Sequence, residues 1–297
     1  MPAASTHVEF SKDVYNILPK SILAEITNLQ MYYLGSQGPD TFFFSRASVF
    51  PGTLKKYGDL MHYEKVPEAI SFMENYIGDD ADLKSYFYGY LCHYALDSIC
   101  HPLINAVSRK MHEDTGTHEG EYHVTCEGAI DVWIFAQRGR DVSTYDVYKD
   151  LAVSKSDAEK LAKMYHELFQ EVYGLELSAK KIKSAIHDIA FYTKVLSPKQ
   201  GSFKVIYGLE SLVRMPHAIS GMIMLNKTDY AVLNLEHYPY PLIYNEDETI
   251  SDDFATLYGK AVYVARGLMD HHDMSDFDKN FSGTPSKYQP YDKKIVI

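Results

Sequence analysis

Three side chains that readily bind metal ions recur at intervals of four residues within the apolar segment "YLCHYALDSICHPLI", residues 90–104. In an α-helix, His93, Asp97 and His101 lie along one side, because each step of four residues rotates the side chain by only about 40°. Their neighbours are apolar, so this side is expected in the interior, where unpaired polar groups cost free energy. A helix over about residues 81–100 with a metal ion on its buried face meets both constraints.

A second helix is expected to supply further ligands. His123 and Glu127 are four residues apart in "HVTCEGAID", and Asp131 follows after four more. Imidazole and carboxylate groups on one helix face suit zinc or another divalent transition metal. Two such helices side by side can enclose more than one ion. Asp131 either orients a ligand or is simply an acid in a salt bridge.

Three earlier residues complete the candidate set: His7 at the start of the first expected helix, Asp40 in "GSQGPD" and His62 in "DLMHYE". Taken singly, such residues are more often surface groups or hydrogen-bonded core groups than ligands. For the two helices, the alternative is a network of ion pairs between them, which is a poor source of stability when buried. For Cys100, a reduced core cysteine competes with a thiolate ligand.

The rest of the chain has the pattern of helices joined by loops. Apolar residues recur at helical spacing in segments 11–35, 66–78, 155–175, 178–196, 201–225 and 252–272. The polar segment 108–123 and the segment 237–251, rich in Tyr and Pro, are expected to be loops. We find no repeat and no linker. We therefore expect a single all-α domain over residues 1–297, with its metal site built mainly from residues 6–135.

Composition limits the partners. The 297 residues carry a net charge of −11, which argues against duplex nucleic acid as the main partner. No segment has the roughly 18 uninterrupted apolar residues of a membrane span. The first ten residues lack a basic region followed by an apolar core, so we expect no secretory signal and a cytoplasmic location. A secreted chain whose signal had been removed would look the same.

The motifs together resemble one family. "TH" at 6–7, "GSQGPD" at 35–40, "HYALDSICH" at 93–101 and "HVTCE" at 123–127 are similar to those of the bacterial zinc-dependent phospholipases C. These enzymes are related in fold to the fungal single-strand-specific zinc nucleases. The resemblance implies an all-α multi-helix fold that holds zinc and hydrolyses a phosphoester.

The resemblance also implies how the ligands divide. Asp40, His62, His93 and Asp97 match the ligands of one zinc ion, and His101, His123 and Glu127 match those of a second. His7 matches a ligand of a third ion that shares Asp97. Secreted members complete this third site with an N-terminal tryptophan, whereas this chain begins with Met1 and Pro2. We therefore expect two or three zinc ions, the third without that ligand.

Three functions are compatible with this site. The first is a phospholipase C-like phosphodiester hydrolase, in which water activated by zinc cleaves a phospholipid head group and Asp40 is the catalytic residue. Its contact with a membrane surface would be transient. The second is a single-strand nuclease or nucleotidase. The third is a non-catalytic helical binding protein stabilised by its metal ions. The sequence assigns neither a head group nor an oligomeric state.

Overall fold

The computed structural model describes residues 4–48, 50–116, 119–197, 204–208 and 230–289. Within them the prediction of an all-α fold is confirmed, since the strands form only one two-stranded sheet. The α-helices are α1 (Ala4–Ile17), α2 (Lys20–Leu23), α3 (Leu29–Gly35), α4 (Lys55–Tyr63), α5 (Val66–Ile77), α6 (Ala81–Thr115), α7 (Glu119–Gln137), α8 (Lys155–Glu171), α9 (Ala179–Val195) and α11 (Phe254–Asp270). Two short 3-10 helices, η1 (Gly38–Phe42) and η2 (Ser45–Ser48), follow α3.

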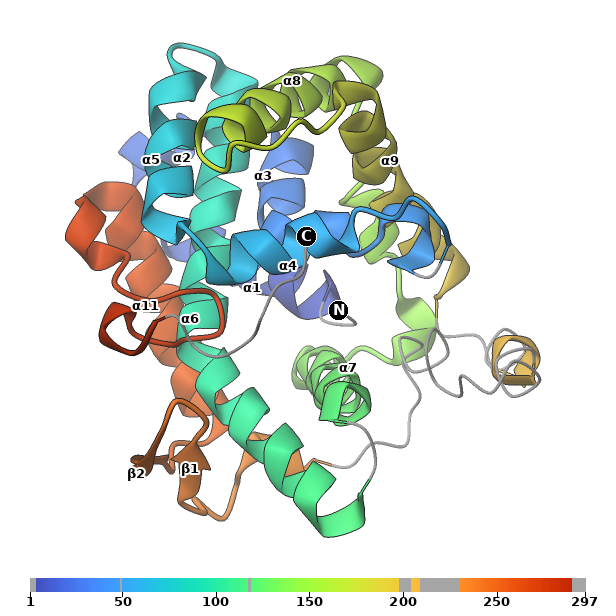
Figure 1. Cartoon of the computed structure of the whole chain (residues 1–297), viewed down its shortest axis with the longest axis vertical. Helices are drawn as coiled ribbons and strands as arrows, with labels where there is room; N and C mark the ends of the chain where they lie inside the picture. The colour runs from blue at the N-terminus through green and yellow to red at the C-terminus, as the bar shows by residue number, and fades with distance from the viewer. Residues whose placement is uncertain (1–3, 49, 117–118, 198–203, 209–229, 290–297) are drawn as a thin grey trace.

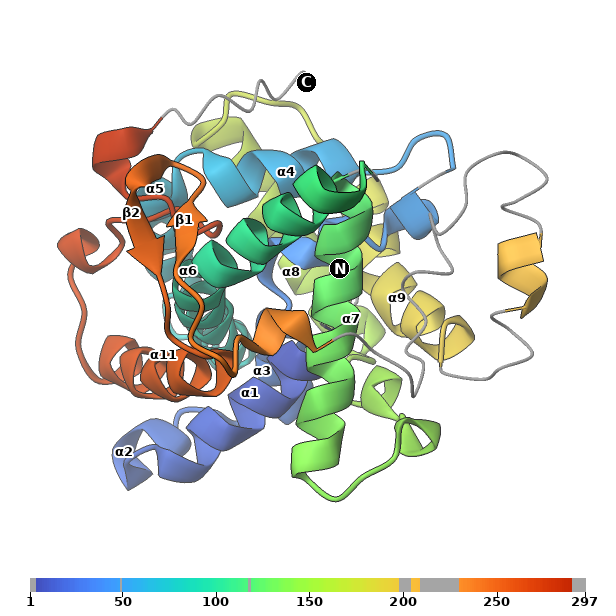
Figure 2. The same ribbon diagram turned by 90° about the horizontal axis from the view of Figure 1, so that it is seen from below.

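Helix α6 is the axis of the fold. It passes through the molecule, with α3 and α11 packed along it and α7 beside its second half (Figure 1). Seen from below, α7 also lies next to α1 (Figure 2). The side chain of Asp80 begins α6 by accepting hydrogen bonds from the backbone N–H groups of Asp82 and Leu83, at 3.0 and 3.1 Å. This arrangement places the middle of α6 at the centre of the core.

The sequence underestimated the length of α6. The expected helix ended near residue 100 and segment 108–123 was expected to be a loop, but α6 continues through Pro102 to Thr115 and α7 begins at Glu119. Within this segment, residues 109–115 form a largely solvated face of α6. Arg109 pairs with Glu113 four residues later, and Lys110 pairs with Asp114 in the same way.

Segment 237–251 was also expected to be a loop, and this expectation was wrong in part. Strands β1 (Tyr240–Leu242) and β2 (Asn245–Ile250) form an antiparallel hairpin there, with Tyr240 opposite Ile250. The hairpin packs beside α6 through β1 (Figure 1). The helix expected over residues 201–225 falls largely outside the described residues.

Several of the many tyrosines are core residues. Tyr32, Tyr86 and Tyr165 are fully buried, and their hydroxyl groups are satisfied within the protein. The hydroxyl of Tyr32 donates to the carbonyl of Ser11 at 2.8 Å, and those of Tyr86 and Tyr165 are 2.6 Å apart. Burying a ring together with a satisfied hydroxyl adds apolar contact without the cost of an unpaired polar group.

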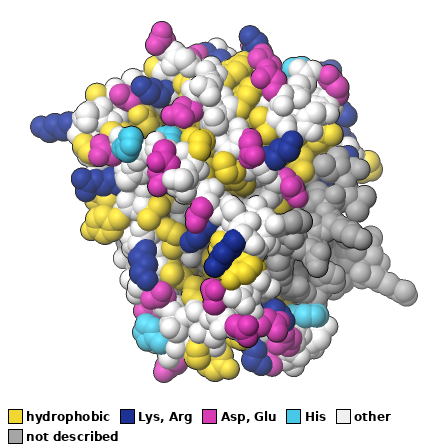
Figure 3. Space-filling view, turned by 60° about the vertical axis from the view of Figure 1, so that its left-hand side comes forward, with side chains coloured by type: hydrophobic (Ala, Val, Ile, Leu, Met, Phe, Trp, Pro, Cys, Tyr) yellow, Lys and Arg dark blue, Asp and Glu magenta, His cyan; other side chains and the backbone are white. Residues whose placement is uncertain are grey.

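The surface is mixed in charge. On the face shown in Figure 3, acidic and basic side chains are interspersed and do not separate into large areas of one sign. Among the described helices, none combines the length and the apolar composition needed to cross a membrane.

Candidate metal centre

The candidate site is built around the middle of α6. His93, Asp97 and His101 lie on one side of this helix, and the side chains of His93 and Asp97 are almost completely buried. Oδ2 of Asp97 lies 3.2 Å from Nε2 of His93 and 3.3 Å from Nδ1 of His101. The carboxylate therefore stands between the two imidazoles, as the four-residue spacing requires.

Two preceding elements bring further ligand types to His93 and Asp97. Asp40 comes from η1 and His62 from α4, and Nε2 of His62 lies 3.1 Å from Oδ1 of Asp40. Nε2 of His62 is also 4.0 Å from Oδ2 of Asp97. These four side chains form the group that the resemblance assigns to one zinc ion.

His7 joins this group from the first helix. It lies in the first turns of α1, and its ring stacks on that of His93 with the centroids 4.4 Å apart. Its Nε2 is 3.4 Å from Oδ1 of Asp97 and 3.8 Å from Oδ2 of Asp40. His7 thus faces Oδ1 of Asp97, whereas His93 faces Oδ2.

The second group is formed between α6 and α7. Oε1 of Glu127 lies 3.5 Å from Nε2 of His101 and 3.1 Å from Nε2 of His123. The two imidazoles stack in parallel, with their centroids 5.5 Å apart. Because Nδ1 of His101 faces Asp97 while its Nε2 faces Glu127, this residue borders both groups.

All eight candidate ligands therefore lie together around the middle of α6. Close-packed donor sets with suitable spacing are His7–Asp40–His93, His62–His93–Asp97 and His101–His123–Glu127. Zinc bonds to nitrogen and oxygen are about 2.0–2.1 Å long, which places tetrahedral ligands roughly 3.4 Å apart. The nearest donor pairs above are 3.1–3.5 Å apart. The donor spacing fits zinc.

The hydrogen bonds of His93 supply a stronger test. Its Nδ1–H donates to the carbonyl oxygen of Ser36 at 3.1 Å, so the other ring nitrogen, Nε2, points into the site. Nε2 of His93, Oδ2 of Asp97 and Nδ1 of His101 are all buried without a hydrogen-bond partner, although the carboxylate oxygen lies only 3.2–3.3 Å from the two nitrogens. Donor atoms left without hydrogen bonds at these distances suit metal ligation, with Oδ2 of Asp97 facing one histidine of each group.

Burial disfavours charge in this site. It lowers the pKa of His7 to about 3 and the pKa of His93 well below its usual value, and it raises the pKa of Asp97 well above the usual range. Burial also opposes ionisation of Asp40, but the contact with His62 and the nearby His93 together outweigh it and hold that pKa below its usual value. A divalent cation would favour the ligating forms, a neutral imidazole and an ionised carboxylate.

Gly38 explains why the "GSQGPD" segment can approach the site. Its φ is +47°, and a Cβ atom there would lie 2.4 Å from Cδ2 of His93. Only glycine allows the chain to turn this way in contact with the ring. Pro39 and Asp40 follow in the first turn of η1, which directs the carboxylate toward the histidines.

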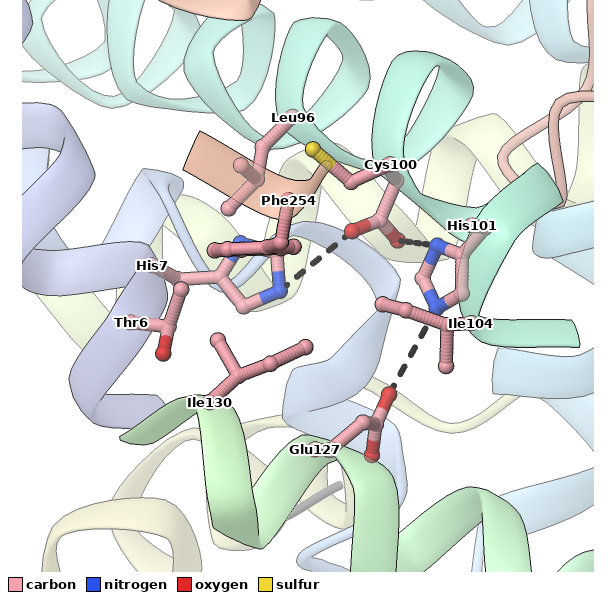
Figure 4. Close-up of a pocket in the computed structure, with 10 residues that line it drawn as sticks. Thr6, His7, Leu96, Cys100, His101, Ile104, Glu127, Ile130 and Phe254 are labelled. Atoms are coloured by element: carbon pink, nitrogen blue, oxygen red, sulfur yellow. Dashed lines mark ion pairs between the residues drawn. The ribbon is translucent and has the colours of Figure 1, made fainter. Parts of the chain in front are cut away.

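Residues of both groups line one pocket. Figure 4 shows His7, His101 and Glu127 around it, with Leu96, Ile104 and Phe254 among its apolar walls. Cys100 also lines the pocket, but burial raises the pKa of its thiol well above the usual value. The cysteine is free and buried, which is compatible with the interpretation of Cys100 as a reduced core residue.

Asp131 bonds to the backbone beside a candidate ligand, His7, and not to the side chain of that residue. Its Oδ1 accepts hydrogen bonds from the backbone N–H of Thr6 at 2.8 Å and from the hydroxyl of Thr6 at 2.6 Å. Thr6 directly precedes His7, so Asp131 joins α7 to the first turn of α1. Neither of the roles considered from the sequence describes this contact.

One neighbour of the site was missed. Phe281, near the end of the chain, contacts the rings of His62 and His93. No local pattern marks it, because its partners lie about 190 and 220 residues earlier in the chain.

Comparison with protein families gave one result. The family model described as "Zinc dependent phospholipase C" matches residues 6–180, more than half of the chain, and this range contains all eight candidate ligands. The curated proteins and the solved structures that were searched gave no match.

Proposed function

The chain belongs to the zinc-dependent phospholipase C family. We propose that it is a zinc-dependent hydrolase of phosphodiesters that cleaves the phosphorylated head group from a phospholipid. One structural observation supports the proposal independently of family membership. Nε2 of His93, Oδ2 of Asp97 and Nδ1 of His101 are buried without hydrogen-bond partners, although Asp97 lies only 3.2–3.3 Å from the two nitrogens. Buried polar atoms of a purely structural network would normally be hydrogen-bonded, whereas donor atoms of a metal site need not be.

We assign the ligands as the two groups suggest. Asp40, His62, His93 and Asp97 hold one ion, and His101, His123 and Glu127 hold another. For a third ion, the described residues offer His7 with the carboxylates of Asp97 and Asp40. The backbone carbonyls of Gly58 and Ser36 orient the rings of His62 and His93 by accepting from their Nδ1–H groups.

Zinc in this site supplies a Lewis acid that neutralises phosphate charge and makes water acidic enough to attack near neutral pH. Asp40 is proposed to accept the proton of the attacking water. Its side chain is buried less deeply than that of Asp97, with 12% against 3% exposed, and its pKa is held below the usual value. Asp97 and His93 are more deeply buried and are assigned as metal ligands only.

The first test is metal content. Protein purified without added metal should contain two or three zinc ions per chain by elemental analysis, and Asp97→Asn should lose at least one of them. The matched control is Asp247→Asn, an exposed carboxylate on β2. A wild-type protein that neither contains zinc nor takes it up would sink the proposal.

The second test is turnover. We expect the zinc protein to release the phosphorylated head group from short-chain phosphatidylcholine, and Asp40→Asn to lower kcat by a factor of about 10²–10⁴, the usual contribution of a positioned proton acceptor. Hydrolysis of single-stranded DNA in preference to phospholipid would favour the nuclease. Bound zinc with no turnover on any phosphodiester would favour the non-catalytic protein.

A further inference from the structure

A loop outside the range matched by the family model packs against α6 at the metal centre. This C-terminal loop, residues 277–289, follows α11 and comes about 100 residues after the matched range ends. The backbone N–H of Phe281 donates to the carbonyl of His62 at 3.1 Å, which joins the loop to the end of α4. The loop therefore meets the chain directly at a candidate ligand.

Phe281 packs against two candidate ligands, His62 and His93. Its side chain is completely buried, and the ring centroid lies 5.2 Å from that of His93 and 5.4 Å from that of His62. Phe43 stacks on His62 with the centroids 5.1 Å apart, and the two rings meet at 24° instead of the 62° of the Phe281 contact. The imidazole of His62 thus has two phenylalanine neighbours in different orientations, and both restrict its rotation.

The loop has an internal framework that holds Phe281 in place. Oδ1 of Asn280 accepts hydrogen bonds from the backbone N–H groups of Ser282 and Thr284, each at 3.0 Å, and from the hydroxyl of Ser282 at 2.8 Å. Lys279 and Pro285 pair across the base of the turn. The side chains of Asn280, Ser282 and Thr284 are buried and satisfied, so the turn is a defined structure.

The loop is also fitted closely to α6 beside a third ligand. Gly283 has a φ of +76°, and a Cβ atom there would lie 2.4 Å from Cγ of Pro102, the residue after His101. The side-chain amide of Asn105, one turn further along α6, donates to the carbonyl of Ser282 at 3.4 Å. The position of the loop is therefore set against the same part of α6 that carries His101.

We propose that the C-terminal loop is a structural part of the metal centre and that Phe281 is a positioning residue for His62 and His93. The inference rests on the proposed function, because it assumes that these two histidines hold zinc. A histidine that binds zinc must keep its ring in one orientation, and the packing of Phe281 removes the alternatives. Loss of groups that orient metal ligands typically lowers metal affinity by about 10- to 100-fold.

The test compares two buried phenylalanines of the same loop. Phe281→Ala removes the ring from the ligands, whereas Phe277→Ala removes an equally buried ring that contacts Tyr94 and His272 and no candidate ligand. Phe281→Leu is included because it keeps most of the buried volume and is the variant better able to fold. Zinc dissociation constants are measured by competition with a chelator, and cobalt is used to record the visible spectrum of the site.

For both Phe281 variants we expect about 10- to 100-fold weaker binding of one zinc ion and an altered cobalt spectrum, with Phe281→Leu less affected than Phe281→Ala. Phe277→Ala should bind zinc and cobalt as the wild type does, even if its melting temperature falls. Equal zinc affinities and spectra for Phe281→Leu and Phe277→Ala would overturn the inference while leaving the metal site intact. A wild-type protein without zinc would overturn the proposed function and this inference together.

Discussion

Gly38 controls the approach of the Asp40 segment to His93. Gly38→Ala places a Cβ atom 2.4 Å from the His93 ring and forces a side chain into a left-handed backbone conformation. The backbone effect costs roughly 1–2 kcal/mol and overpacking adds about 1–3 kcal/mol. We expect the variant to lose that much unfolding free energy in denaturant titration and to retain less zinc.

Gly174→Ala is the matched control for this prediction. Gly174 has a φ of +68°, and no atom lies within 4 Å of the place that a Cβ would occupy, so only the backbone cost applies. The zinc content of this control should equal that of the wild type. If both variants lose the same unfolding free energy and neither loses zinc, the contact between Gly38 and His93 has no role in shaping the site.

Asp131 gives a prediction about pH. Burial raises its pKa to about 8, against about 3.9 in an unfolded chain. Between these values the folded state holds a proton that the unfolded state has released, so this residue lowers stability as the pH rises from about 4 to about 8. The slope it contributes is at most about 1.4 kcal/mol per pH unit.

Asp131→Asn removes that contribution. Measured on zinc-free protein in denaturant, the unfolding free energy of the variant relative to that of the wild type should increase from pH 5 to pH 8 and level off above pH 8. The comparison cancels the titration of the other groups, which both proteins share. A difference that does not change with pH would show that Asp131 is ionised in the folded protein.

Among single residues, the sequence was informative where ligands share a helix. His93, Asp97 and His101, and likewise His123 and Glu127, were recognised because helical spacing alone places them on one face. Their apposition across α6 and α7 depended on the resemblance, since periodicity does not say which helices pack together. Phe281 was missed because its contacts form only when α4, α6 and the C-terminal loop meet.

Among the elements, the outline of the fold was predicted better than its ends. Helices α5 and α11 occupy Val66–Ile77 and Phe254–Asp270, close to the expected segments 66–78 and 252–272. The second half of α6 was missed because its polar face, which includes Arg109 and Glu113, resembles a loop in composition, although Leu103, Ile104 and Val107 are buried in the core. The hairpin was missed because Pro241 interrupts the pattern of β1.

Removal of zinc should accelerate amide hydrogen exchange in some helices and leave it nearly unchanged in others. The proposed ligands come from α1, η1, α4, α6 and α7, whereas α8 and α9 supply none and pack against each other. Treating the zinc protein with a chelator should therefore accelerate amide hydrogen exchange in the half of α7 that carries His123 and Glu127. Exchange in α8 and α9 should hardly change. A uniform increase across all these helices would mean that zinc stabilises the fold as a whole.

At the scale of the whole molecule, the charge bears on the substrate. The net charge of −11 and the mixed face in Figure 3 offer little attraction to a polyanion. We expect kcat/KM on a zwitterionic phospholipid to change less than about threefold between 50 and 200 mM salt. A protein with 6–10 phosphate contacts loses about 10³–10⁵ in affinity over that range. A loss of that size, with single-stranded DNA as the better substrate, would favour the nuclease.

The position of Phe281 along the chain has a consequence for biosynthesis. More than 150 residues separate it from Glu127, the last of the eight proposed ligands. At about 5–20 residues per second, a ribosome needs roughly 10 to 30 seconds to add that stretch. During this interval the nascent chain already carries every ligand but lacks the loop that restrains two of them. Zinc that binds during this interval would dissociate readily, and it would dissociate more slowly once the C-terminal loop has been synthesised and has folded.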